Sequence, residues 1–277
     1  MYKKSIKIAT IIAASSLIFA CGGDHEETTN EEVVITEEVV TEEETAQIDY
    51  VLPSPLQIAE LFKRAGLTYI GDVTNAPESV DNYTTKYDQK LNYGVYSADM
   101  AYCIMNNQTQ ESIDYLATLS KLSEKLWMTD IMGSMGLTDR LEANVGNEDS
   151  LTYIMADLQM QMDDYLDENG MGYTGSIIFA GAWIETLYLG TKVNENEKNE
   201  KLIGRLSEQA VILESLIASI KQSDTDNEYA ELITDLEGLN ATFNGYADSE
   251  EDFMLNDEAV STLGEQIKTL RAKIIGA

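Results

Sequence analysis

Apolar residues recur every three or four positions through most of the chain after residue 50, which is the period of an amphipathic helix. The last segment shows this clearly, because one stripe holds Val260, Leu263, Ile267, Leu270 and Ile274. Strand-like alternation is scarce after residue 80, and the prolines are confined to Pro53, Pro55 and Pro77. The pattern therefore predicts an all-α domain.

Helix boundaries follow from this periodicity together with polar capping residues. Ser54, Asn147, Thr174 and Asn256 stand where N-caps are expected, each ahead of an apolar-periodic segment. Short polar connections such as "NEDS" and "SDTD" indicate antiparallel neighbours. We expect a single antiparallel bundle of about eight to nine helices, at residues 55–65, 79–106, 109–128, 130–143, 148–168, 175–193, 197–222, 226–246 and 256–275.

One helix differs from the rest because it is apolar nearly all round. "SIIFAGAWIETLYLG", residues 176–190, is typical of a central buried helix, and Glu185 in its middle argues against a membrane span. Its "GAWIETLYL" from Gly181 resembles "GVYSADMAY" from Gly94, where a glycine also precedes an aromatic residue and a mixed apolar helix.

The amino terminus has the pattern of a bacterial lipoprotein signal, assigned here to residues 1–20. Three lysines in "MYKKSIK" precede an uncharged run from Ile8 to Phe19, which is too short to span a bilayer. "IFAC" resembles a lipobox, in which a small residue precedes an obligatory cysteine. We therefore expect Cys21 to be lipidated and to begin the mature chain. The alternative is an ordinary signal peptide that happens to precede a cysteine.

Residues 21–49 read as an acidic flexible tether. Positions 22–49 hold eleven Asp or Glu residues and no Lys or Arg, and like charges at this density extend a chain. The acids soon after Cys21 also resemble, loosely, a surface-export signal of Bacteroidota lipoproteins. The helical domain is then expected at residues 50–277.

Charge and residue usage exclude several classes of chemistry. A net charge of −31 opposes nucleic-acid binding and repels anionic headgroups; it fits either a saline habitat or weak cation binding. The only histidine is His25 in the tether, so the domain has no Ser-His-Asp or Cys-His catalysis and no histidine-bearing metal site. Cys103 has no partner cysteine in the domain, and a buried inert thiol is expected.

Three motifs resemble cofactor or metal sites but are better explained as structure. Gly170, Gly172 and Gly175 match a dinucleotide fingerprint, yet they follow a helix rather than a strand, which favours a C-cap glycine. "DENGMG" lacks the first and last ligands of a calcium loop. Methionines that could bind copper(I) include Met155 and Met162, which fall on an apolar stripe and suit a core. We expect no cofactor and no metal.

The candidate site consists of acids within apolar helices. Asp99 and Glu185 would be costly to bury without partners, and tyrosine hydroxyls, Asn92 or Arg64 could supply them. One reading is a structural polar contact. The other is an aromatic-acidic pocket for a small polar or cationic ligand, formed by Tyr96, Asp99, Tyr102, Trp183, Glu185 and Tyr188.

Three stretches between about Leu52 and Leu189 are distinctive: "PSPLQIAELFKRAGLTY", "NYTTKYDQKLNYGVYSADMAYC" and "AGAWIETLYL". This part of the chain resembles a group of helical lipoproteins from Bacteroidota. The resemblance implies a lipid-anchored all-α domain in the cell envelope, at the outer membrane, and carries over no activity. Residues 190–277 add generic amphipathic helices.

Three functions remain open from the sequence. The first is a non-enzymatic binding or scaffolding module for an envelope protein partner. The second is a ligand-binding domain with the aromatic-acidic pocket. The third is a hydrolase that uses two carboxylates, for which the separation of the carboxyl groups discriminates. With no histidine in the domain and no cofactor motif, we expect no enzymatic activity.

Overall fold

A computed structural model describes residues 52–128, 136–144, 146–246 and 254–277. The chain divides into two units, Met1–Ala46 and Gln47–Ala277, and the described residues all belong to the second. They form ten α-helices and one 3-10 helix, with no strand among them, so the predicted all-α bundle is confirmed. The predictions for Cys21, the signal and the tether lie outside the described residues.

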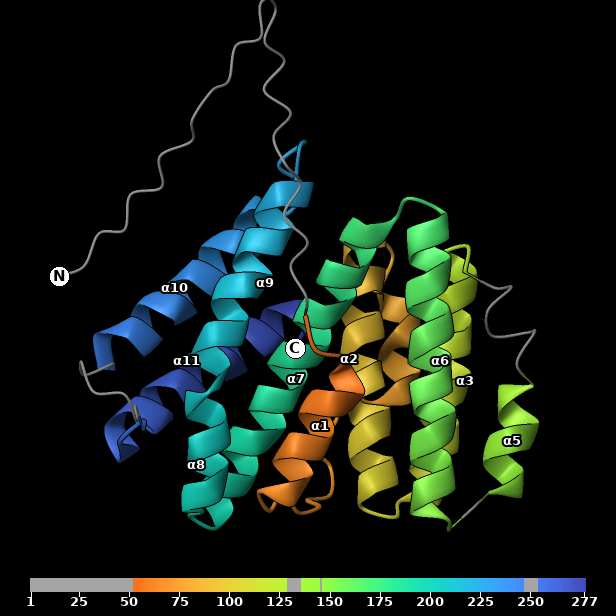
Figure 1. Ribbon diagram of the computed structural model, residues 1–277, viewed down its shortest axis with the longest axis horizontal. Helices are drawn as coiled ribbons and strands as arrows, with labels where there is room; N and C mark the ends of the chain where they lie inside the picture. Colours follow the sequence, from red (N-terminus) through yellow and green to blue (C-terminus); the bar gives the residue numbers. More distant parts are fainter. Residues whose placement is uncertain (1–51, 129–135, 145, 247–253) are drawn as a thin grey trace, which may run out of the picture. The chain divides into compact units, whose positions relative to one another are not determined.

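Figure 1 shows the helices coloured and labelled in the order in which they occur along the chain. Their bounds are α1 Pro55–Arg64, η1 Pro77–Asn82, α2 Lys86–Met105, α3 Thr109–Lys125, α5 Leu137–Ala143, α6 Glu148–Glu168, α7 Gly172–Asn196, α8 Glu200–Ser207, α9 Gln209–Ser223, α10 Ala230–Tyr246 and α11 Asp257–Ile275.

Three of the four predicted N-caps are confirmed. Ser54 forms a capping box with Gln57, and the side chains of Asn147 and Asn256 each accept a backbone N–H of the first turn of α6 and α11. Thr174 is wrong as a cap, because α7 already begins at Gly172 and Thr174 lies buried inside it. A turn in which the Thr174 N–H donates to the Met171 carbonyl starts the helix early.

Two predicted helices are interrupted in the structure. The segment 79–106 contains the 3-10 helix η1 and then α2, because the Thr85 side chain accepts the Asp88 N–H and starts a new helix. The segment 197–222 divides at Glu208 into α8 and α9. Next to this division the Ser207 hydroxyl accepts a hydrogen bond from the distant Leu255 N–H, a tertiary contact that periodicity does not reveal.

Helix α7 is the central helix, as its apolar sequence predicted. It contacts α1, α2, α6, α8, α9 and α11, and its residues from Ser176 to Leu187 are all buried. No helix in the described part of the chain is long and apolar enough to cross a membrane.

Two glycines allow α2 and α7 to touch backbone to backbone. A Cβ at Gly94 would overlap the carbonyl of Ile178, and a Cβ at Gly181 would overlap that of Leu91. The two glycines that open the similar sequence stretches therefore lie at one helix crossing, five residues before Asp99 and four before Glu185. This crossing brings the two acid-bearing segments together.

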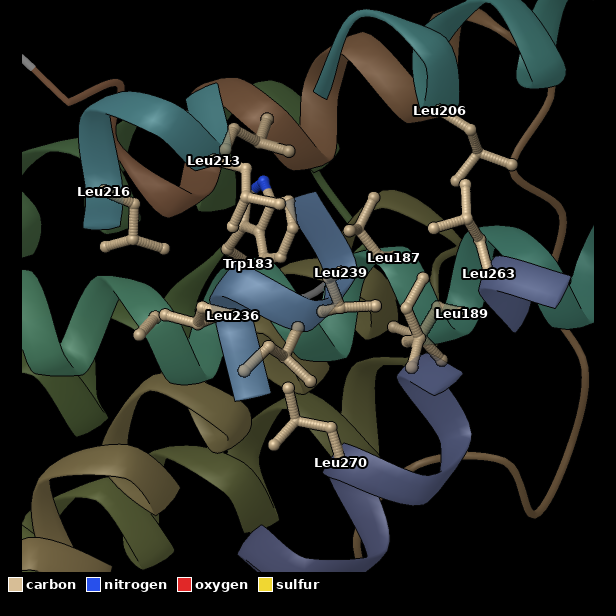
Figure 2. Close-up of a cluster of buried hydrophobic side chains, with 14 of the residues drawn as sticks. Trp183, Leu187, Leu189, Leu206, Leu213, Leu216, Leu236, Leu239, Leu263 and Leu270 are labelled. Carbon is tan, nitrogen blue, oxygen red and sulfur yellow. The ribbon is translucent and has the colours of Figure 1, made fainter. Parts of the chain in front are cut away.

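The apolar core consists of two clusters that share α1, α2 and α7. The first is formed mainly by α7 with α8 to α11, and Figure 2 shows Trp183 of α7 surrounded by leucines from these helices. The second joins α2, α3, α5 and α6, and contains Met100, Met155 and Met162. The predicted core role of Met155 and Met162 is therefore confirmed.

Candidate functional site

The six predicted site residues lie on two crossing helices but do not share one pocket. Tyr96, Asp99 and Tyr102 belong to α2, and Trp183, Glu185 and Tyr188 to α7. All except the half-buried Tyr188 are at most 1% exposed. The structure brings Asp99 and Glu185 together, whereas Trp183 turns into the first cluster, where its Nε1 donates to Gln209 Oε1 at 3.0 Å.

Glu185 is neutralised by an arginine from the far end of the chain. Arg271 of α11 donates from Nε to Glu185 Oε2 at 2.6 Å and from Nη2 to Oε1 at 2.9 Å. The guanidinium also stacks on the Tyr188 ring, 4.1 Å from its centroid, and donates to the Val73 carbonyl at 3.1 Å. Burial raises the pKa of Glu185, and the charge and hydrogen bonds of Arg271 oppose that rise by favouring the ionised form.

Neither residue proposed from the sequence as a charge partner fills that role. Arg64 is exposed and pairs with Glu60 one turn away. Asn92 donates instead to the backbone carbonyls of Asp88 and Ile274. One sequence signal for Arg271 did exist, because this arginine falls on the apolar stripe of its helix, four residues after Ile267 and three before Ile274.

Asp99 is buried near the Glu185–Arg271 pair. Its Oδ2 accepts the Asn75 N–H at 3.0 Å, and its Oδ1 is buried with no hydrogen-bond partner among the described residues. Desolvation by burial, reinforced by the Glu185 charge, raises the pKa of Asp99 well above its usual range, although Arg271 opposes this. Of the two acids, we assign the protonated form to Asp99, because Arg271 pairs with Glu185 and not with Asp99.

The surrounding tyrosines bind the irregular segment between α1 and η1, residues 68–76. The Tyr102 hydroxyl donates to the Thr68 carbonyl at 2.8 Å and accepts the Ile70 N–H at 2.7 Å. Tyr96 donates to the Ala76 carbonyl at 2.9 Å, and Tyr115 to the Asn75 carbonyl at 3.0 Å. Much of this segment is exposed, and Asn75 is its one buried residue. The three tyrosine hydroxyls give its inward-facing backbone groups partners. These tyrosine side chains form a structural clamp, which we name the loop clamp.

Asp99 and Glu185 are not arranged like the acids of a two-carboxylate hydrolase. Such enzymes separate their carboxyl groups by about 5 Å or more, so that a sugar bond and a water fit between them. Here Asp99 and Glu185 are both 0% exposed, and Glu185 is paired with Arg271. No substrate reaches the two groups in this arrangement.

A cavity lies elsewhere, between the start of α1 and the four helices α2, α3, α6 and α7. It measures about 330 Å³, and the segment Leu52–Pro55 forms part of its wall. Its apolar surface is contributed by Leu56, Tyr93, Met100, Leu119, Met155, Leu158, Met162, Leu166, Ile178 and Phe179. None of the six predicted site residues lines it. We name this space the α1–α6 cavity.

Sequence reasoning missed this cavity because its lining residues look like ordinary core positions. Met155 and Met162 occupy an apolar stripe, and only the space left unfilled between four helices distinguishes them from other buried residues. The methionine cluster was a weak signal, since flexible thioether side chains adapt to irregular spaces and to varied ligands.

The glycine motif has no cofactor geometry. Gly170 takes a left-handed conformation at φ +65°; its N–H donates to Asp167, and the Met171 N–H donates to Leu166, a Schellman ending to α6. The predicted C-cap glycine is thus confirmed, and Gly175 lies within α7 beside the α1–α6 cavity. Across residues 52–277, leaving out the undescribed positions, no group of three His, Cys, Asp or Glu is placed to hold a metal ion.

Comparisons with protein-family models, with curated proteins and with solved structures found no match to this chain. The resemblance to Bacteroidota lipoproteins therefore stays a prediction from the sequence.

Proposed function

We propose that this protein is a lipid-anchored lipoprotein of the bacterial cell envelope, at the outer membrane, and that its helical domain acts as a non-enzymatic binding module. Cys21 carries the anchor, residues 22–49 provide the tether, and the α1–α6 cavity receives the ligand. The anchor rests on the lipobox pattern "IFAC" after an apolar run.

The observation that carries the binding function is the cavity itself. Its volume of about 330 Å³ lies in the range typical of small-molecule sites, which are mostly apolar with a few polar groups. Hollows of similar or larger volume occur elsewhere on the described part of the chain, but they are lined mostly by polar residues. This one is partly open to solvent and reaches apolar side chains of the core. A ligand that fills it would remove this apolar surface from water.

The surroundings of Asp99 and Glu185 support a function without catalysis. Both acids are buried away from solvent; Glu185 is paired with Arg271, and Asp99 accepts the Asn75 N–H. Cys103 is 1% exposed, and burial raises the pKa of its thiol, which disfavours the nucleophilic thiolate.

The anchor is tested by expressing the full chain in a bacterium supplied with an alkyne-tagged fatty acid. Wild type should incorporate the label and sediment with membranes, whereas Cys21→Ala should lose the label and remain soluble. A Cys103→Ala variant is the matched control and should behave as wild type. Equal labelling of wild type and Cys21→Ala would contradict the anchor.

The binding function is tested by extracting the purified full chain with organic solvent and analysing the extract by mass spectrometry. Wild type should retain a molecule in near-stoichiometric amount. Gly175→Leu, which places a side chain in the cavity, should lose it. Gly245→Leu is the control, because Gly245 is also a helical glycine and lies in α10, away from the cavity, where a Cβ would meet nothing within 4 Å. A wild-type protein without any retained molecule would contradict the proposal.

A further inference from the structure

The chemical class of the ligand follows from the lining of the α1–α6 cavity, and this inference rests on the proposed function. The inner wall is apolar and buried: Met100 is 1%, Met162 3% and Phe179 4% exposed. Three thioethers and a phenyl ring offer dispersion contacts and adjustable shape but no strong hydrogen bond. The inner part of the cavity therefore suits a hydrocarbon group.

The three serines in the wall do not call for a polar ligand. The Ser97 hydroxyl donates to the Tyr93 carbonyl at 2.8 Å, and Ser176 shares a hydrogen bond of 2.7 Å with Ser219. Ser54 Oγ accepts the Gln57 N–H at 3.2 Å. Because these hydroxyls already have partners, a hydrocarbon can lie against them without leaving them unpaired. Tyr93 also lines the cavity, and its buried hydroxyl has no hydrogen-bond partner among the described residues, so its ring and not its hydroxyl suits the hydrocarbon.

The polar end of the ligand is placed by α6. Gln159 and Asp163 lie one turn apart there and are the lining residues with an amide or a charge. Gln159 Nε2 donates to Asp163 Oδ1 at 2.9 Å. Of the residues that line the cavity, none is Lys, Arg or His, and the whole chain carries a charge of −31. An anionic headgroup would find repulsion without a counter-charge, whereas a cationic or uncharged one would not.

The volume sets the length of the hydrocarbon. An apolar cavity of about 150 Å³ accepts benzene, so a cavity of about 330 Å³ accepts roughly a dozen carbon atoms by the same scale. We infer that the α1–α6 cavity binds a single alkyl or acyl chain of about this length whose polar end is cationic or uncharged and lies beside Gln159 and Asp163.

The test is titration calorimetry with the full chain bearing Cys21→Ser, purified without detergent. The probes are alkyltrimethylammonium ions, alcohols and carboxylates of about eight to sixteen carbons, each kept below its micelle concentration. Affinity should rise with chain length and level off near twelve carbons, and dodecyltrimethylammonium and dodecanol should both bind more tightly than dodecanoate. Gly175→Leu should weaken binding at least about tenfold, which corresponds to excluding two methylenes.

Two further variants test separately the role of the cavity volume and the role of the Asp163 charge. Ser97→Leu fills the cavity from α2 and should also weaken binding, should Gly175→Leu fail to fold. Asp163→Asn should reduce the preference for the cation over the alcohol about twofold to fivefold, the size of an exposed ion pair, and leave the alcohol affinity unchanged. Gly245→Leu should bind as wild type.

Three results would overturn the inference: dodecanoate binding as tightly as the cation, affinity that rises with length without levelling off, or no binding of any probe. If a retained molecule is nevertheless found in wild type and lost in Gly175→Leu, the ligand class is wrong and the binding function stands. If neither probe nor retained molecule is found, both fall.

Discussion

Arg271 and Glu185, 86 residues apart in the sequence, form a buried bidentate ion pair with bonds of 2.6 and 2.9 Å. The pair joins α11 to α7, and through the Val73 carbonyl it also holds the segment between α1 and η1. The carboxyl-terminal helix is thereby tied to the loop clamp.

Removing Arg271 should destabilise the fold strongly. In Arg271→Met, Glu185 keeps its charge in the interior without a partner, which costs about 3–5 kcal/mol of unfolding free energy. Urea denaturation followed by circular dichroism measures this. The matched control is Arg205→Met, since Arg205 forms only an exposed pair with Glu208 and should cost about 1 kcal/mol or less.

The double variant Glu185→Gln with Arg271→Met should be more stable than the sum of the two single changes predicts. It removes both charges, so neither remains unpaired, and a coupling of about 1–3 kcal/mol is expected. Strict additivity would show that the two side chains do not depend on one another.

Asp99→Asn should leave the stability near that of wild type at neutral pH. An amide can accept the Asn75 N–H, as the acid does, and it is uncharged like the protonated acid. Asp99→Ala leaves the Asn75 N–H without its partner and should cost about 1–3 kcal/mol. A large loss in Asp99→Asn, measured by the same denaturation, would mean that Asp99 is ionised in the folded state.

The pH dependence of the stability of Asp99→Asn provides a second test of the protonation of Asp99. Burial raises the pKa of folded Asp99 above the unfolded value of about 3.9, so the folded state holds a proton that the unfolded state releases. The stability from this group is complete below the unfolded pKa and is lost as the pH rises toward the folded pKa. The stability of Asp99→Asn relative to wild type should therefore increase as the pH rises above about 4. A difference that does not change as the pH rises would refute the assignment.

Gly181→Ala should destabilise the domain by about 3 kcal/mol or more, because its Cβ would overlap the rigid backbone of α2 at Leu91. Gly238→Ala is the control. Gly238 is an exposed glycine of α10 with no neighbour within 4 Å, so alanine should stabilise the helix by up to about 1 kcal/mol. Thermal unfolding separates the two, and similar midpoints would contradict the close crossing.

Cys103 should resist alkylation in the folded protein. It is 1% exposed, and desolvation raises the pKa of its thiol. With Cys21 replaced, iodoacetamide should label Cys103 only once urea unfolds the chain, as mass spectrometry would show. Rapid labelling without urea would mean that α2 opens readily.

The helical class, the central position of α7 and three of the four caps follow from local pattern. An apolar stripe, a capping side chain and a helix apolar on all sides each act over one or two turns, so the sequence contains them directly. The interruption at Glu208 does not follow, since it coincides with a contact between Ser207 and Leu255.

Asp99 and Glu185 were recognisable from the sequence as unusual, because carboxyl groups in apolar helices need partners. Their partners were not recognisable. Arg271 and Asn75 reach them from distant parts of the chain, and nothing local states which cation a buried acid will meet. The cavity depends on the space left between four helices, which no single segment specifies. Local sequence is therefore enough to locate the helices and the acids that are costly to bury, whereas the pairing of those acids and the position of the cavity depend on how distant helices pack.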